Sequence, residues 1–287
     1  MGSAFERILA GTDGSLRAEE AVRQAARLAS LTGAELEVVY VFDQSRPPGP
    51  FRDPSAPTAY ADHALEEAGR IADKEDVEAT LRVLVGDPAI MLVHHAQERW
   101  ADLVCVGADA GLFEKPHLLG GVAVHVVRNA HASVLVSRAP EESLGMTFPG
   151  RVLCAVDGSD CSMEAVRTGA ALAAQAEASF RLLHVVPVIS GYGVGWTAVG
   201  EPSGFEPLSP AVEVAERMGL DPAREMALGR PAPVIAETAR SEGVDLVALG
   251  SRGLHGLSRV LLGSVSEWVA RHAGCSVLVT RKLSARR

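Results

Sequence analysis

The 287-residue chain has few cysteines and no long apolar run. Its four cysteines form no CxxC pair and no Cys/His spacing typical of a metal site, so neither a disulfide framework nor a zinc module is expected. No stretch of 18 or more apolar residues is present, which argues against a membrane-spanning helix. The N-terminal segment carries Glu6, Arg7 and Asp13 where a signal peptide needs an apolar core. We therefore expect a cytoplasmic protein that does not associate with membranes.

Basic residues and catalytic motifs are also scarce. Lys and Arg number 27 against 36 Asp and Glu, and a net charge of −9 would repel nucleic acid. Neither GxxxxGK[ST] nor HExxH occurs, and no GxGxxG lies near the glycine-rich loop described below. Ser159 lies in DGSD rather than in a GxSxG elbow. The sequence thus offers no catalytic residue and no metal ligand.

The chain contains an internal repeat the size of a whole domain. ILAGTDGSLRAEEAV begins at Ile8 and VLCAVDGSDCSMEAV at Val152, an offset of 144 residues. VCVGADAGLFEKPHLLGG at Val104 is matched by VALGSRGLHGLSRVLLGS at Val247, an offset of 143. Such a period is far longer than that of a solenoid repeat. We predict two domains, residues 1–139 and 151–287, joined by a linker over residues 140–150.

Each half reads as alternating strands and helices. In the first half we expect strands at Arg7–Thr12, Leu36–Phe42, Leu81–Val85, Asp102–Val106 and Ser133–Ser137. Helices are expected directly after the DGS turn and at about Ala61–Lys74, Pro88–Arg99 and Leu119–Asn129. Strands such as LVCV and LVAL are apolar at consecutive positions, which suits a parallel sheet covered on both faces. The predicted fold class is α/β, with two tandem doubly wound domains that each contain a five-stranded parallel sheet.

The segments that follow the second strand of each half, Gln44–Thr58 and Val188–Gly204, are rich in proline and glycine. We expect both to be irregular, on the side of the sheet where ligands bind.

A glycine-rich loop follows the fourth strand of the second half. Gly250 and Gly253 allow backbone amides to approach a ligand, and Gly263 and Ser264 begin a helix whose N-terminus favours an anion. Ser266 adds a hydroxyl, and Arg252 adds a positive charge. This combination predicts a site for the phosphates of a nucleotide.

The spacing of this loop closely resembles that of ATP-binding members of the universal stress protein family. Those proteins carry Gly, two residues, Gly, nine residues and then Gly-Ser or Gly-Thr, and Gly250, Gly253, Gly263 and Ser264 fit in full. The resemblance covers nearly all of both halves and implies the fold shared with adenine nucleotide α-hydrolases. It implies ATP, ADP or AMP as ligand, with or without Mg²⁺, held by Asp157, Val185, Leu249, Gly250, Gly253, Gly263, Ser264, Val265 and Ser266.

The resemblance assigns roles within this set. Asp157 and the backbone of Val185 would hold adenine and ribose, Leu249 would line the base, and residues 250–266 would hold the phosphates. The sequence leaves a second role open for Asp157, because an aspartate at this place also caps the following helix.

The first half keeps only part of the set. Asp13, Val41, Gly107 and Gly120 remain as a weaker second site, while Asp109, Ala110 and Gly121 stand where the second half has Arg252, Gly253 and Ser264. Since Asp109 repels phosphate and Gly121 lacks a hydroxyl, we expect weak binding or none in the first half.

The favoured function is an ATP-binding universal stress protein that acts as a nucleotide sensor or regulator. Two alternatives stay open: an α-hydrolase-type enzyme with slow ATP hydrolysis or AMP transfer, and a scaffold that binds no nucleotide. The apolar fifth strands, Ser133–Arg138 and Ser276–Arg281, are expected to pair the two domains within the chain. The sequence leaves open whether the whole chain also forms a homodimer.

Overall fold

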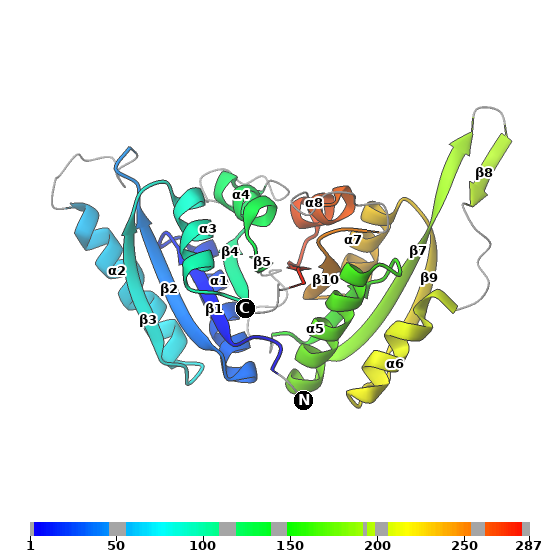
Figure 1. Cartoon of the computed structure of the whole chain (residues 1–287), viewed down its shortest axis with the longest axis horizontal. Coiled ribbons are helices and arrows are strands. Elements are labelled where there is room, and N and C mark those ends of the chain that lie inside the picture. The colour runs from blue at the N-terminus through cyan, green and yellow to red at the C-terminus, as the bar shows by residue number, and fades with distance from the viewer. Residues whose placement is uncertain are drawn as a thin grey trace. The chain divides into compact units, whose positions relative to one another are not determined.

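The computed structural model describes residues 3–45, 56–108, 119–138, 148–191, 194–198, 206–253 and 262–282. The chain divides into two compact units, residues 1–139 and 140–282, which we call the first and second domain (Figure 1). No helix among the described residues is both long enough and apolar enough to cross a membrane.

The first domain has one parallel five-stranded sheet in the order β3-β2-β1-β4-β5. Its elements are β1 (Arg7–Thr12), α1 (Leu16–Thr32), β2 (Glu35–Phe42), α2 (Ala56–Asp73), β3 (Ala79–Val85), α3 (Pro88–Glu98), β4 (Leu103–Gly107), α4 (Gly121–Asn129) and β5 (Ser133–Ser137). The five strands expected from the sequence are therefore confirmed, with boundaries that differ by at most two residues.

The second domain repeats this sheet in the order β11-β10-β6-β7-β9 and adds one antiparallel strand, β8, beside β7. Its elements are β6 (Arg151–Ala155), α5 (Asp160–Ala176), β7 (Ser179–Gly191), β8 (Val194–Ala198), the 3-10 turn η2 (Glu206–Leu208), α6 (Ser209–Arg217), β9 (Ala223–Gly229), α7 (Pro231–Ser241), β10 (Leu246–Gly250), α8 (Ser264–His272) and β11 (Ser276–Thr280).

The DGS turn begins the first helix of both domains by the same capping bond. The hydroxyl of Ser15 accepts from the backbone N–H of Ala18, and that of Ser159 accepts from Ser162. This bond satisfies one of the donors left open at a helix start. Helix α1 ends at Gly33, whose φ of 70° is the left-handed conformation that glycine adopts most readily.

The helices cover both faces of each sheet, as the consecutive apolar residues of the strands predict. In the first domain α1 contacts α2, and α3 contacts α4. The chain crosses from β3 to β4 on the other side of β1, so right-handed crossovers place α3 and α4 on the opposite face from α1 and α2. Strands β5, β10 and β11 are buried along their whole length.

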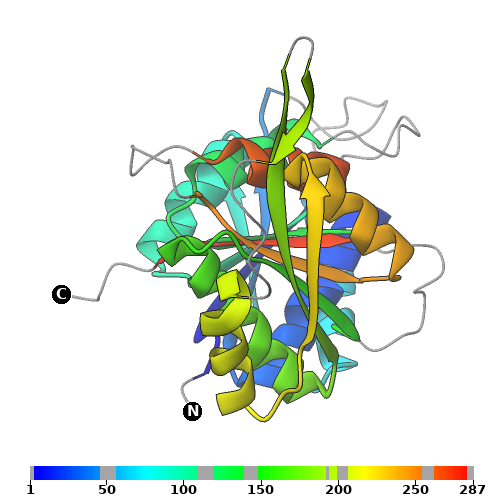
Figure 2. The same cartoon turned by 90° about the vertical axis from the view of Figure 1, so that its right-hand side faces the viewer.

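The expectation of two irregular segments after the second strands was wrong in part. Helix α2 already begins at Ala56, and β7 runs on to Gly191 and pairs with β8 as a two-stranded ribbon beyond the sheet (Figure 2). Pro187 is the last β7 residue with a partner in β9, so its missing N–H falls where the ladder ends. Glycine and proline therefore mark the change from sheet to ribbon rather than the end of regular structure.

A nearly buried carboxylate links three elements of the first domain. Glu37 of β2 is only 8% exposed, and its Oε1 lies 2.6 Å from Nε of Arg82 and 3.1 Å from Nε2 of His95. Its Oε2 lies 3.1 Å from Nε of Arg99. Burial by itself would raise the pKa of Glu37, but these partners outweigh burial and hold the pKa below its usual range. The carboxylate thereby fastens β3 and the end of α3 to β2.

The second domain contains a similar network in which the charged residues have opposite signs and Thr238 stands in place of His95. Arg181 of β7 takes the place of Glu37, with its guanidinium 3.2 Å from Glu225 and 2.6 Å from Glu242. Glu225 and Glu242 follow Arg82 and Arg99 by the repeat offset of 143 residues. The geometry of the attachment is thus kept while its charges are inverted.

We expect Glu37→Gln to lower the free energy of unfolding of the first domain by about 1–3 kcal/mol at pH 7, because two guanidinium groups lose their common partner. A depressed folded-state pKa stabilises the protein above the unfolded pKa of about 4.3, and that contribution is lost as the pH falls through the folded-state pKa. Urea denaturation between pH 3 and 7 should show this loss in the wild type and not in the variant. Glu66→Gln, which removes an exposed partner of Arg70, is the matched control and should change little.

Candidate functional site

Three loops of the second domain meet at the carboxyl edge of its sheet. The chain leaves β6 towards β7 on one side and reaches β10 on the other, so the ends of β6 and β10 border a topological switch point. Ligands of open α/β sheets bind in such crevices. Of the predicted residues, Asp157 follows β6 and Gly250 ends β10, while Val185 lies in β7 beyond the end of β6.

Asp157 lies between the helix start and the glycine loop. Its Oδ1 accepts a 3.0 Å hydrogen bond from the backbone N–H of Ser159, while Ser159 itself caps the helix. Its Oδ2 lies against Gly253, because a Cβ at residue 253 would come within 2.6 Å of that oxygen. One oxygen of Asp157 therefore shapes the turn, and the other is directed at the loop where a ligand is expected.

The backbone of Val185 lies in the part of β7 that extends beyond the end of β6. Leu183 accepts a 2.8 Å hydrogen bond from Val156, directly after β6 ends at Ala155. In a parallel strand the backbone groups of residues i and i+2 point to the same side. The N–H and C=O of Val185 therefore point towards β6 at a level that β6 no longer reaches, as an adenine edge requires.

Gly250 lets the fourth strand meet the first turn of α5. A Cβ at residue 250 would lie 2.5 Å from the carbonyl carbon of Cys161 and 2.7 Å from the N of Ser162. The loop then closes through a 2.7 Å backbone bond from Gly263 to Ser251. Residues 254–261, with His255, Gly256 and Arg259, lie outside the described residues.

The start of α8 presents backbone donors to this edge. Its N-cap, Gly263, has no side chain to accept from the first turn, which begins with Ser264, Val265 and Ser266. Such N–H groups and the positive end of the helix dipole attract an anion. The hydroxyl of Ser266 donates to the Gly250 carbonyl at 2.6 Å, so this side chain braces the loop and leaves the backbone N–H as its contribution to a ligand. Leu249 is buried in β10.

Two arginines, Arg252 and Arg281, follow β10 and β11 at this edge of the sheet. Burial, reinforced by the charge of Arg252, lowers the pKa of Arg281 to about 10. Two neighbouring positive charges favour a polyanionic ligand over a neutral one. The sequence prediction included Arg252 and missed Arg281. The sequence could have placed Arg281 at this edge, because it directly follows the fifth strand and the carboxyl ends of parallel strands share one edge.

The first domain keeps the same backbone arrangement. A Cβ at Gly107 would lie 2.9 Å from the Arg17 carbonyl oxygen, and Gly120 donates a 2.7 Å bond to the Ala108 carbonyl. Asp13 accepts from the N–H of Ser15 at 3.0 Å, as Asp157 does from Ser159. Asp109 and Ala110 lie outside the described residues. The predicted second site therefore shares the loop closure of the predicted site in the second domain.

The nucleoside ends of the two domains differ. A Cβ at Gly14 would lie 3.2 Å from Ala64 of α2, whereas one at Gly158 would meet nothing within 4 Å. Burial, together with the charges of Asp13 and Tyr60, raises the pKa of Tyr40, which precedes Val41. Helix α2 thus covers the Asp-Gly turn of the first domain, whereas no atom of the described residues comes within 4 Å of a Cβ at Gly158 in the second domain.

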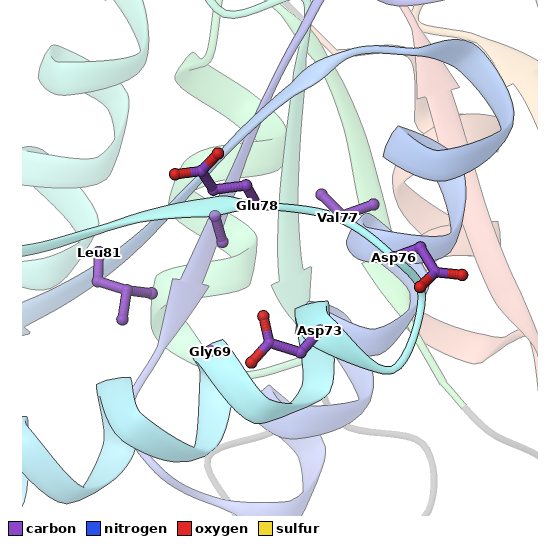
Figure 3. Close-up of a pocket in the computed structure, with 7 residues that line it drawn as sticks. Gly69, Asp73, Asp76, Val77, Glu78 and Leu81 are labelled. Atoms are coloured by element: carbon purple, nitrogen blue, oxygen red, sulfur yellow. The ribbon is translucent and has the colours of Figure 1, made fainter.

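A separate hollow of about 450 Å³ lies at the opposite edge of the first domain. It is bordered by Asp73 at the end of α2 and by Asp76 and Glu78 before β3, with Gly69 and Leu81 beside them (Figure 3). Its carboxylates would repel phosphate, so it does not resemble a nucleotide site. Among the residues that the structure describes, no group of three His, Cys, Asp or Glu side chains is arranged to hold a metal ion.

Comparisons with known proteins agree with the repeat. The model of the universal stress protein family matches residues 4–138 and again 149–281. Universal stress protein Rv2623 of Mycobacterium tuberculosis is 27% identical over 98% of both chains. A solved universal stress protein from Archaeoglobus fulgidus shares the fold, with a TM-score of 0.72 at 19% identity over 99% of this chain and 100% of that chain. A universal stress protein solved in complex with cAMP is 28% identical over 47% of this chain and 99% of its own, with a TM-score of 0.39.

We expect Gly250→Ala to destabilise the second domain by about 1–3 kcal/mol, because the added methyl meets backbone atoms that cannot rotate away. Gly121→Ala is the contrasting variant, since a Cβ there meets nothing within 4 Å and the residue opens helix α4. Thermal unfolding of the full chain should show the loss for Gly250→Ala and no loss for Gly121→Ala. Equal midpoints would show that the close approach is not required.

Proposed function

The chain belongs to the universal stress protein family, as its sequence predicted, and we propose that its second domain binds an adenine nucleotide, ATP or ADP. The nucleotide lies along the carboxyl edge of the sheet and is retained rather than consumed. Its binding changes the shape or the association of the protein, which makes the chain a nucleotide-responsive regulator in stress.

The strongest support for this proposal is the anion-binding arrangement of the second domain. The uncapped N-terminus of α8 and the arginine pair Arg252 and Arg281 lie at the same edge as the open backbone of Val185. A ligand that binds the helix N-terminus, the arginines and the Val185 backbone carries several negative charges at one end. At its other end it has a planar ring with donor and acceptor groups. Adenosine di- and triphosphate have this composition.

The first domain is proposed to bind nucleotide weakly or not at all. Gly121 offers no hydroxyl at the start of α4, and the sequence places Asp109 where the second domain has Arg252. Helix α2 also lies over the turn that carries Asp13. The loss of a charge-assisted hydrogen bond alone costs about 1.5–3 kcal/mol, or roughly a factor of ten to a hundred in affinity.

Calorimetric titration of the purified full chain with ATP should show about one nucleotide per chain. Arg252→Glu should weaken this binding by a factor of ten or more, because a carboxylate replaces a positive charge beside the phosphates. Arg240→Glu is the matched control, since it makes the same change in net charge at the end of α7, near the opposite edge of the sheet. It should leave the affinity nearly unchanged.

The same preparation separates the alternatives. Two equally tight nucleotides per chain would contradict the unequal domains, and no binding would favour a scaffold. Sustained rapid release of ADP or AMP would favour an enzyme of the α-hydrolase type. Mass spectrometry of nucleotide released from the acid-quenched protein identifies which adenine nucleotide is carried.

A further inference from the structure

We propose that His184 is a positioning residue for the nucleoside end of the second domain's site. This inference rests on the proposed function and deepens it. It assigns to one side chain the role of joining the turn that carries Asp157 to the part of β7 that carries Val185.

The hydrogen bonds at the end of β6 carry this inference. The last backbone bond between the strands runs from the N–H of Val156 to the carbonyl of Leu183, at 2.8 Å. One residue further on, Nδ1 of His184 lies 2.8 Å from the carbonyl oxygen of Val156. A carbonyl only accepts hydrogen bonds, so Nδ1 is the donor. The imidazole thus replaces the next backbone bond of the ladder after the strands have separated.

The consequence follows from the order of residues in the chain. The carbonyl of Val156 belongs to the peptide unit that leads into Asp157, and His184 is directly followed by Val185. Fixing that carbonyl orients the start of the Asp157 turn relative to the backbone of Val185. This side-chain bond therefore connects the two groups proposed to hold adenine and ribose. A pre-set site binds more tightly because less freedom is lost when the ligand arrives.

The first domain lacks this arrangement at the corresponding place. Tyr40 precedes Val41 as His184 precedes Val185, and its phenol lies near Asp13 and Tyr60. The histidine therefore occurs in the second domain, and the tyrosine in the first domain, whose turn is covered by α2.

Two substitutions in the full chain test this role. His184→Leu removes the donor at similar size, and His184→Asn keeps a side-chain N–H at nearly the same reach. We expect His184→Leu to weaken both adenosine and ATP binding about tenfold and by the same factor, because the bond acts at the end that both ligands share. His184→Asn should restore most of the affinity. Arg252→Glu should instead weaken ATP alone.

The outcomes are distinguishable. If the wild-type chain binds neither ligand, the proposed function fails and this inference fails with it. If the wild type binds and His184→Leu binds equally well, only the inference is overturned. A general loss of structure would lower the thermal midpoint of the Asn and Leu variants alike, so loss without rescue by Asn also contradicts a positioning role.

A second inference rests on an independent observation, the inverted charges of the two ion networks. We infer that this inversion prevents the repeats from exchanging their edge strands during folding. Tandem domains of similar sequence are prone to such misassembly. The oppositely charged Arg or Glu partners of each central residue come from one strand and the end of the helix that follows it, Arg82 and Arg99 in the first domain and Glu225 and Glu242 in the second.

An exchanged unit would meet a charge of its own sign. If β9 and α7 docked on β2, Glu225 and Glu242 would surround the nearly buried Glu37. If β3 and α3 docked on β7, Arg82 and Arg99 would surround Arg181. Two carboxylates placed around the nearly buried Glu37 are strongly unfavourable, while the partly exposed Arg181 adds a weaker repulsion, so the native attachment is favoured in each domain. The shared register of the two sheets makes the exchange geometrically plausible, since Thr80 pairs with Glu37 as Ala223 pairs with Arg181.

In the full chain with Arg181→Glu, Glu225→Arg and Glu242→Arg, both networks have a central carboxylate with arginine partners. We call it the same-sense variant. We expect its recovery of native monomer after dilution from urea to fall at least severalfold, since exchanged units are no longer repelled. A further variant also reverses the first network, through Glu37→Arg, Arg82→Glu and Arg99→Glu. In this variant His95→Thr and Thr238→His move the histidine from the first network to the second. It should regain recovery because the two networks are opposite again.

Recovery equal to the wild type in the same-sense variant would overturn this inference. Recovery that falls further in the fully exchanged variant would also overturn it, because the loss would then follow the number of substitutions. Both measurements use submicromolar protein, so that association between chains does not compete with refolding.

Discussion

The close approach of the fourth strand to the first helix turn is the constraint on which the site depends. At Gly250 and Gly107 the space that a side chain needs is filled by the backbone of α5 or α1. This contact brings the turn after the first strand beside the loop after the fourth strand. The bond from Gly263 to Ser251 then closes that loop and directs the start of α8 to the same edge. The aspartate and the helix N-terminus converge because the backbone leaves no other arrangement.

Features of this frame that depend on neighbouring residues in the chain could be predicted from the sequence. Strands β1 and β5 cover the residues expected, since their consecutive apolar side chains need burial on both faces. Features that depend on distant contacts could not. Helix α2 begins at Ala56, inside the segment Gln44–Thr58 that was expected to be irregular, and β8 exists only because β7 offers it a partner. Glycine and proline alone suggested loops at both places.

The same distinction applies to the site. The glycines and serines of the loop could be predicted because their spacing is a property of one segment. The bond of His184 to Val156 and the effect of the Arg252 charge on Arg281 become visible only with the register of the strands. The role of Ser266 also required the fold: its hydroxyl is used by the Gly250 carbonyl, sixteen residues earlier in the chain.

The parts of the site that backbone hydrogen bonds fix are alike in the two domains, whereas the parts that side chains form have diverged. Backbone N–H and C=O groups are present whatever the residue, so the closure from Gly120 to Ala108 persists although Gly121 replaces the serine of the second domain. A domain built in this way can lose the groups that attract an anion without losing its fold. The ion networks are more constrained, because a single reversed charge places like charges together, most unfavourably at the nearly buried Glu37, so the charged residues of a network change together. Side chains at the ligand edge can therefore change one at a time, whereas the charged residues that link the strands change together.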